Sequence, residues 1–209
     1  MDTNRFPHRR AAVAATAAAA GLALAACGSQ GDTSTATSSP ATTAPTAARQ
    51  SDRHNQADVT FAQGMIPHHL QALVMSDMVE SHGATSEVEA LAEKIKKAQK
   101  PEIDTMTGWL EAWGEEVPTG MDGMGHGDDT TGMPGMMGDQ DMNRLGQANG
   151  STFDDMFLTM MIEHHEGAID MAKTEKREGA YGPATALADS IITSQTAEIA
   201  QMRMMLNAT

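Results

Sequence analysis

The sequence predicts an all-α fold, a four-helix bundle built from two repeated helical hairpins. Residues 61–110 align without a gap with residues 157–206, and 18 of the 50 aligned pairs are identical. Apolar side chains in each copy recur with the period of a helix, and no segment alternates as a strand does. Because one hairpin cannot bury its apolar stripe alone, we expect the two copies to pack together.

The N-terminal residues 1–26 are predicted to be an export signal. Arginines precede an apolar, alanine-rich run, and Leu-Ala-Ala-Cys closes it at residues 24–27. This ending resembles a bacterial lipobox, which implies cleavage before Cys27 and lipidation of its thiol. The run is too short and too rich in alanine to be a good bilayer span. The Arg9-Arg10 pair leaves both the general secretory route and twin-arginine export open.

The rest of the chain divides by composition. Residues 27–56 are rich in Ser, Thr, Ala and Pro and are expected to form a disordered tether. Residues 57–209 are expected to form the bundle domain, with repeat one at 57–114, a Met-rich loop at 115–150 and repeat two at 151–209. The domain is therefore expected to be extracytoplasmic, anchored to the outer face of the cell membrane by lipidated Cys27.

The composition narrows the class of partner. The net charge of −14 makes nucleic acid an unsuitable partner and favours cations. The single cysteine excludes an intramolecular disulfide. There are 18 methionines and few aromatic residues, and since a Met-rich core needs no metal, the positions of the methionines must decide their role.

The first helix of each repeat carries a stripe that begins at Phe61 or Phe157 and ends at Met75 or Met171. Gly83 is expected to end the first of these helices, and Gly179 the second. Pro67 has two readings. It bends a continuous helix and frees the carbonyl of Gln63, or the helix begins near it.

The second helix of each repeat is predicted to begin with its own signal. Ser86 and Glu89 form a capping box in the first copy, and Pro183 takes the first helical position in the second. Glu102 and Glu198 lie within the apolar stripes of these helices. A carboxylate in a bundle needs a partner, so we expect each to accept the non-ligating N–H of a histidine. Salt bridges on the helix surface are the alternative.

Each first helix places methionine and a pair of histidines on one face, in a Met-x-x-His pattern. Thioether sulfur is soft and uncharged and suits Cu(I) and Ag(I), whereas di-iron bundles carry Glu-x-x-His at this spacing. Pairing of the hairpins is expected to bring the two faces together as a cage of thioethers and imidazoles, of which at most four bind one ion. The predicted metal ligands are Met65, His68, His69, Met75, Met161, His164, His165 and Met171.

The stretch between the repeats is rich in Met, Gly and Asp and shows no helical stripe. Methionines there are expected to stay out of the core and to capture soft ions, with aspartates adding attraction; a linker that happens to be Met-rich is the alternative. The predicted secondary ligands are Met121, Met124, His126, Met133, Met136 and Met137.

The stretches MIPHHLQALVM and FLTMMIEHHEGAIDMA resemble domain-of-unknown-function family 305 (DUF305), over residues 57–207. The resemblance implies a ferritin-like bundle exported from bacteria, and some members are copper-binding proteins. Leu70-Gln71 follows the first histidine pair where Glu166-Gly167 follows the second, so the two halves need not bind equally.

The sequence therefore predicts a membrane-tethered protein that binds copper as Cu(I), and Ag(I) by the same chemistry, for capture, tolerance or transfer. No catalytic constellation is identified, so the chain is expected not to be an enzyme. The alternatives are a ferritin-like or haem-binding oxidoreductase, with haem held non-covalently because no C-x-x-C-H is present, and a metal-free helical interaction module. The protein partner is unknown.

Overall fold

The computed structural model describes residues 53–120 and 133–207, and every element in these residues is helical. The all-α prediction is confirmed for this part of the chain. None of the described helices is both long and apolar enough to cross a membrane. The elements are α1 (Gln56–Met78), a 3-10 turn η1 (Val79–His82), α2 (Ser86–Trp113), α3 (Asp139–Gln147), α4 (Ser151–Glu178) and α5 (Gly182–Leu206).

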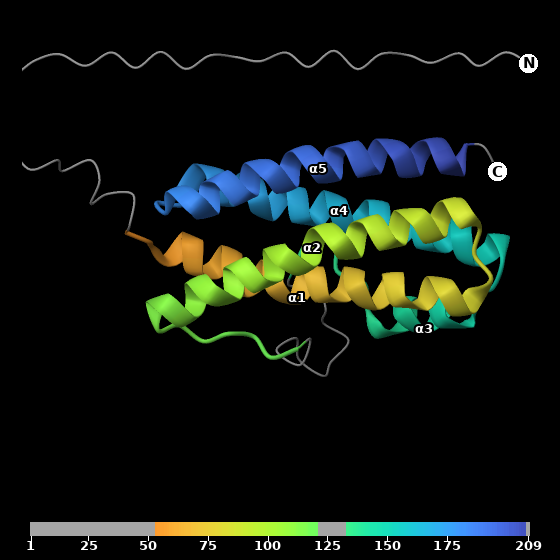
Figure 1. The fold of residues 1–209 in the computed structure, drawn as a ribbon, viewed down its shortest axis with the longest axis horizontal. Helices are drawn as coiled ribbons and strands as arrows, with labels where there is room; N and C mark the ends of the chain where they lie inside the picture. The colour runs from red at the N-terminus through yellow and green to blue at the C-terminus, as the bar shows by residue number, and fades with distance from the viewer. Residues whose placement is uncertain (1–52, 121–132, 208–209) are drawn as a thin grey trace, which may run out of the picture. The chain divides into compact units, whose positions relative to one another are not determined.

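The two halves of the repeat occupy equivalent helix pairs. Helix α1 packs against α2, α4 packs against α5, and the pairs meet mainly where α1 contacts α4 (Figure 1). Short connections join the partners within each pair, so the partners run in opposite directions. Helix α3 lies in the interval where the sequence indicated only a loop, and it packs on α4.

Helix α1 begins with a complete capping box. The Asn55 side chain accepts hydrogen bonds from the backbone N–H groups of Ala57 and Asp58, and the Asp58 carboxylate accepts the N–H of Asn55 at 2.6 Å. The helix then continues through Pro67 to Met78. Of the two readings of Pro67, a helix that begins there is wrong.

The predicted helix ends are correct at some positions only. Gly83 adopts the left-handed conformation, with φ 64°, as a C-terminal glycine should. Gly179 ends α4 but has φ −68°, so its role is not the left-handed one. The capping box predicted at Ser86 does not form, because α2 already includes Ser86 and its hydroxyl bonds to Glu87. Pro183 lies in the first turn of α5, one residue after its start.

The core consists of two clusters of buried side chains. The first, here the Met75 cluster, includes Met75, Phe157 and Met161. The second, the Met65 cluster, includes Phe61 and Met65. Helices α1 and α4 contribute to both clusters, so each helix passes from one to the other along its length. The histidine pairs lie between the two clusters along these helices.

A segment before α3 is fixed to the bundle by one side chain of α1. The amide of Gln71 donates to the carbonyl of Met137 and accepts its N–H, both at 2.8 Å. Met137 is thereby buried, at 6% exposure, in the Met75 cluster. The expectation that methionines of this interval stay out of the core is wrong for Met137, because the Gln71 amide replaces the regular face that the sequence lacks.

The same segment crosses α4 at a point where only glycine fits. A Cβ atom on Gly167 would lie 2.8 Å from the Cα of Gly135, and closer still to the carbonyl oxygen of Pro134. A Cβ on Gly135, which has φ 76°, would lie 2.5 Å from the carbonyl oxygen of Glu163. The two backbones are therefore in direct contact.

Two buried carboxyl groups join the start of α1 to the turn between α4 and α5. Asp58 accepts the backbone N–H groups of Ala180 and Tyr181, which with that of Asn55 hold its pKa below the usual value although burial opposes this. Glu175 is 1% exposed and lies beside Asp58, and its protonated carboxyl donates a hydrogen bond to the Asp58 carboxylate. Burial, together with the neighbouring Asp58, raises the pKa of Glu175 to about 8.

The raised pKa of Glu175 predicts that stability falls as the pH rises from about 4.5 to about 8. The folded state keeps the Glu175 proton up to a pH of about 8, whereas the unfolded chain releases it near 4.5, so stability falls as the pH rises between these values. Glu175→Gln removes this dependence. We expect the variant to gain about 1–3 kcal/mol in unfolding free energy relative to wild type at pH 9, measured by urea denaturation at pH 7 and 9. The exposed Glu178→Gln is the matched control, and an equal pH dependence in all three proteins would refute the prediction.

The contact at Gly167 predicts a second, steric effect. Gly167→Ala places a methyl group against the Pro134 carbonyl, and we expect the free energy of unfolding to fall by about 1–3 kcal/mol. Gly108→Ala is the control, because a Cβ there meets nothing within 4 Å and lies inside α2. It should be neutral or raise stability by up to about 1 kcal/mol. Equal stability of the two variants, by thermal denaturation, would show that the segment does not rest on α4.

Candidate metal site

The two repeats meet through their histidines. The rings of His68 on α1 and His164 on α4 lie with centroids 3.8 Å apart and planes tilted by 39°. His69 and His165 follow them along the same helices, and all four residues are 0% exposed. The duplicated histidine pairs therefore lie at the contact between the two hairpins, removed from solvent.

The proton of His68 is located by its partner. Its Nε2 lies 3.1 Å from the carbonyl oxygen of Pro134, and a carbonyl can only accept, so Nε2 carries the hydrogen. The Nδ1 of the neutral ring then keeps a free lone pair. No hydrogen bond reaches this Nδ1 although it is buried. The segment before α3 thus leaves His68 with one nitrogen free to coordinate.

Glutamates from the partner helices fix the second histidine of each pair. Glu102 on α2 accepts a hydrogen bond from Nε2 of His69 at 2.7 Å, and Glu198 on α5 accepts one from Nε2 of His165 at 2.9 Å. The predicted contact between carboxylate and imidazole is present in both halves. The Nδ1 atoms of both rings are without a hydrogen-bond partner. Carboxylates hold histidine ligands in this way at many metal centres.

His164 has the most unusual surroundings of the four. Neither of its ring nitrogens has a hydrogen-bond partner, although the residue is 0% exposed. Buried polar atoms in proteins are nearly always paired, so an unpaired imidazole requires an explanation. A ligand that accepts a nitrogen lone pair, such as a metal ion, would supply the missing partner.

Burial keeps the imidazoles of His68, His164 and His165 uncharged. Loss of solvent, with the nearby His69 adding repulsion, lowers the pKa of His68 to about 3. Burial and the neighbouring His68 lower the pKa of His164 well below its usual value. Burial also lowers the pKa of His165, although Glu198 opposes it. Neutral imidazole is the form that coordinates metals, so these rings are ready to act as ligands at neutral pH.

The charge of Glu198 is retained in spite of its burial. Burial alone would raise its pKa, but the hydrogen bond from His165 and the nearby Lys94 outweigh this and hold the pKa below the usual value. The Nζ atom of Lys94 lies 3.4 Å from the second carboxylate oxygen. A charged acceptor strengthens the hydrogen bond to His165 and raises the basicity of its free nitrogen.

The predicted methionine ligands separate into two groups. Met75 and Met161 belong to the Met75 cluster, and Met65 and Met171 to the Met65 cluster. Met65, Met75 and Met161 are 0% exposed, while Met171 is half-buried. Helices α1 and α4 run in opposite directions past the histidines. Met65, before the first histidine pair, therefore lies at the same end as Met171, which follows the second pair, and Met161 lies at the same end as Met75. The eight residues therefore do not form one cage.

The histidines and carboxylates alone do not make a ready metal site. In the described parts of the chain, no three His, Cys, Asp or Glu side chains are arranged to hold one ion. Any site at this contact must take sulfur ligands as well. Such a mixed set of neutral nitrogen and sulfur donors is selective for soft metals.

Part of the predicted site lies outside the described residues: Cys27, Met121, Met124 and His126. Of the other secondary ligands, Met133 lies close to the bundle. Its Sδ and that of Met171 would lie 3.6 and 3.7 Å from a Cβ at Gly64, so the two sulfurs share a space that the glycine leaves open.

Sequence reasoning missed the contribution of two residues to the site. One is the carbonyl of Pro134, and the other is Gln71, which holds the segment that carries it. Gln71 is the repeat equivalent of Gly167, the residue on which this segment rests. The replacement of Gln71 by glycine at the equivalent position of the second repeat was the signal in the sequence that the two halves meet this segment differently.

The chain belongs to the family called domain of unknown function DUF305, which matches residues 58–206. It is similar to a DUF305 protein of Streptomyces coelicolor that is named as secreted, with 34% identity over 73% of this chain and 93% of that one and a TM-score of 0.65. A DUF305 fragment from Deinococcus radiodurans is 26% identical, covers 74% of this chain and 98% of its own, and has a TM-score of 0.66.

A third solved relative, CopM, has been crystallised with metals. Its Cu(II)-bound form is 33% identical over 72% of this chain and 96% of that chain, with a TM-score of 0.62. Its Cu(I)-bound and Ag-bound forms each match with 30% identity and a TM-score of 0.59. No curated protein matches this chain.

The low pKa values of the buried histidines predict acid sensitivity of the metal-free protein. A histidine in the unfolded chain takes up its proton near pH 6.5, whereas His68 in the fold does so only near pH 3. Its contribution to stability is therefore complete above pH 6.5 and is lost as the pH falls towards 3. His164→Leu removes one such group. Between pH 7 and 4.5, the free energy of unfolding should fall in both proteins. We expect the fall to be smaller in the variant than in wild type by at least about 1 kcal/mol, measured by urea denaturation. The control is His54→Leu, outside the core, and an unchanged pH dependence for His164→Leu would contradict the prediction.

Proposed function

We propose that this member of the DUF305 family is an extracytoplasmic, membrane-tethered protein that binds copper as Cu(I), and Ag(I) by the same chemistry. It captures, stores or transfers the ion and performs no catalysis. The proposed ligands are those predicted from the sequence, drawn from the histidines at the contact of α1 and α4 and from the methionines on either side of them. Glu102 and Glu198 hold two of the histidines in place.

One observation carries the proposal. The four histidines are fully buried, their Nδ1 atoms have no hydrogen-bond partner, and His164 has none at either nitrogen. A fold that buries polar atoms unpaired loses free energy unless a ligand compensates for it. Neutral imidazole nitrogens beside thioether sulfurs are a donor set that suits Cu(I).

The methionines indicate how ions divide between the two ends. Met75 and Met161 lie at one end of the histidine contact, and Met65 and Met171 at the other. Each end therefore offers two thioethers and the nearest imidazoles. We propose that each end binds its own ion, with no more than four of these side chains around it.

The relatives support the chemical class. CopM binds Cu(I), Cu(II) and Ag in its crystal structures, and its match covers 72% of this chain. The Met-x-x-His faces of both repeats, where di-iron helices carry Glu, favour the soft metals among the possible cargoes. The net charge of −14 adds general attraction for cations.

The tether and the architecture are further parts of the proposal. The lipobox-like ending at Cys27 and the secreted relative from Streptomyces coelicolor support a domain held outside the cytoplasm by a lipid. Residues 1–26 would then be the signal and residues 27–56 the tether. The pairing of α1 with α2 and of α4 with α5 supports a ferritin-like bundle of two repeated hairpins.

The test is an anaerobic Cu(I) titration against a chromophoric chelator, using the chain without residues 1–50. We expect tight binding by wild type and a loss of at least about 100-fold in affinity for His68→Ala combined with His164→Ala. Glu102→Gln with Glu198→Gln keeps the ligands but weakens their support, and should cost about 10–100-fold. Bound Cu(I) should also raise the melting temperature.

His82→Ala is the matched control, because His82 lies outside the buried contact and hydrogen-bonds to the carbonyls of Met78 and Gly146. If the paired histidine variants bind as wild type does, the assignment of the ligands is wrong. A Soret band in the purified protein would favour the haem alternative. An absence of any thermal shift with Cu(I) would favour the metal-free module.

A further inference from the structure

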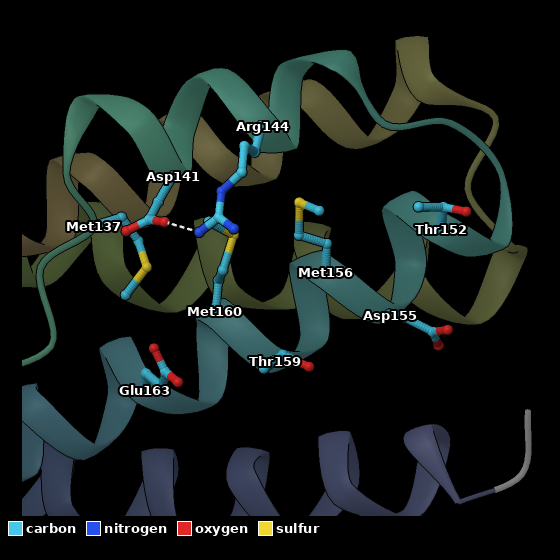
Figure 2. Close-up of a pocket in the computed structure, with 9 residues that line it drawn as sticks. All are labelled: Met137, Asp141, Arg144, Thr152, Asp155, Met156, Thr159, Met160 and Glu163. Atoms are coloured by element: carbon cyan, nitrogen blue, oxygen red, sulfur yellow. Dashed lines mark hydrogen bonds and ion pairs between the residues drawn. The ribbon is translucent and has the colours of Figure 1, made fainter.

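A pocket of about 470 Å³ lies between α3 and α4, apart from the buried histidines (Figure 2). Its α4 wall includes Met156, Met160 and Glu163. At about 100° per residue, this face of α4 is turned away from Met161 and His165. None of the four buried histidines lines the pocket. His164 lies one turn after Met160 on α4, so the pocket borders the proposed copper site along this helix but includes none of its histidines.

Three thioethers surround the pocket. Met156 and Met160 lie one turn apart on α4, and Met137 lies opposite them on the segment before α3. Figure 2 shows the three side chains directed into the space between α3 and α4. Met137 and Met160 are each only 6% exposed, so their sulfurs are largely removed from water while the pocket itself opens to solvent.

The position of Met137 is set by the fold. Its backbone N–H and carbonyl are both bonded to the Gln71 amide at 2.8 Å, and the preceding Gly135 rests on α4. The sulfur on this side is therefore held against the two on α4. A site whose donors are placed before the ion arrives loses less conformational freedom on binding.

The charges around the pocket suit a cation of low charge. Asp141, Asp155 and Glu163 lie on its walls, and Arg144 is ion-paired with Asp141. Figure 2 shows this ion pair at the α3 side, with Glu163 on the α4 side. One carboxylate is thus neutralised locally, and Glu163 remains to attract a cation. Carboxylates alone do not gather here as the ligands of a hard divalent ion.

We propose that Met137, Met156 and Met160 form a second, solvent-accessible site for a soft monovalent metal ion, Cu(I) or Ag(I). This inference rests on the proposed function for the class of ion, but it uses none of the histidine ligands. Three uncharged thioethers are the donors that Cu(I) and Ag(I) prefer over the common hard cations. The site takes up its ion directly from solvent, whereas the histidine contact is buried.

The test uses the full chain with its methionine methyl groups labelled with ¹³C and titrated with Ag(I), which is diamagnetic. We expect the methyl resonances of Met137, Met156 and Met160 to shift together with the first ions added. The same three shifts should appear in the His68→Ala, His164→Ala variant. If these resonances do not respond to Ag(I), the second site does not exist.

The second test replaces two of the sulfurs and measures the number of Ag(I) ions bound. Met156→Leu with Met160→Leu keeps apolar volume but removes two donors, and we expect the protein to bind one Ag(I) fewer. The matched control is Met204→Leu on α5, which is 66% exposed and lies outside both sites, and it should bind the wild-type number. Equal stoichiometry in the pocket variant and the control would overturn the inference.

The two proposals fail in different ways. If the histidine variants lose an ion and the pocket variant loses none, the copper-binding function stands and the second site is wrong. If the pocket variant loses an ion and the histidine variants lose none, the second site stands and the histidine assignment is wrong. If the wild-type chain binds no Ag(I) and no Cu(I), both are refuted.

Discussion

The fold is organised around four imidazoles buried where α1 crosses α4. Moving a charged ring into this contact is so unfavourable that burial holds the pKa of His68 and His164 far below the usual value. The second ring of each pair is oriented by a glutamate from the partner helix of its own hairpin. The packing of each hairpin and the contact between hairpins therefore meet at the same rings, and burial there keeps His68, His164 and His165 neutral. That is also the state in which imidazole coordinates a metal.

The duplicated halves are not equivalent, and one pair of positions explains why. A single segment joins the two repeats, and it contacts each repeat through a different residue at this equivalent position. Gln71 holds this segment through the backbone of Met137, and its repeat equivalent Gly167 leaves the space into which Pro134 fits. The Pro134 carbonyl then accepts a hydrogen bond from Nε2 of His68, whereas neither ring nitrogen of His164 has a hydrogen-bond partner. The histidine of the second repeat is thus the more available donor.

The thioethers proposed to bind metal lie at three distinct places within the described residues. Two groups flank the histidines, one in each core cluster, and a third lines the pocket between α3 and α4. The flanking groups are fully or mostly buried, whereas the pocket is open. Methionine suits both settings, because its side chain is apolar enough to pack in a core and its sulfur still binds a soft ion. The same residue type therefore serves the core packing and the proposed cargo without a buried charge.

The helices, their repeat and the buried faces were determined by the sequence itself, because a period of 3.6 residues and a duplicated pattern are local properties that need no partner. For Glu102 and Glu198 the sequence indicated that each carboxylate needs a partner but left histidine and surface salt bridges open, and the structure supplies the histidines. Only the tertiary structure decided that the methionines divide between two ends, because the antiparallel crossing of α1 and α4 sets which side chains meet. It also decided the short α3, the burial of Met137 and the carbonyl on His68, which depend on contacts made 66 residues apart in the chain.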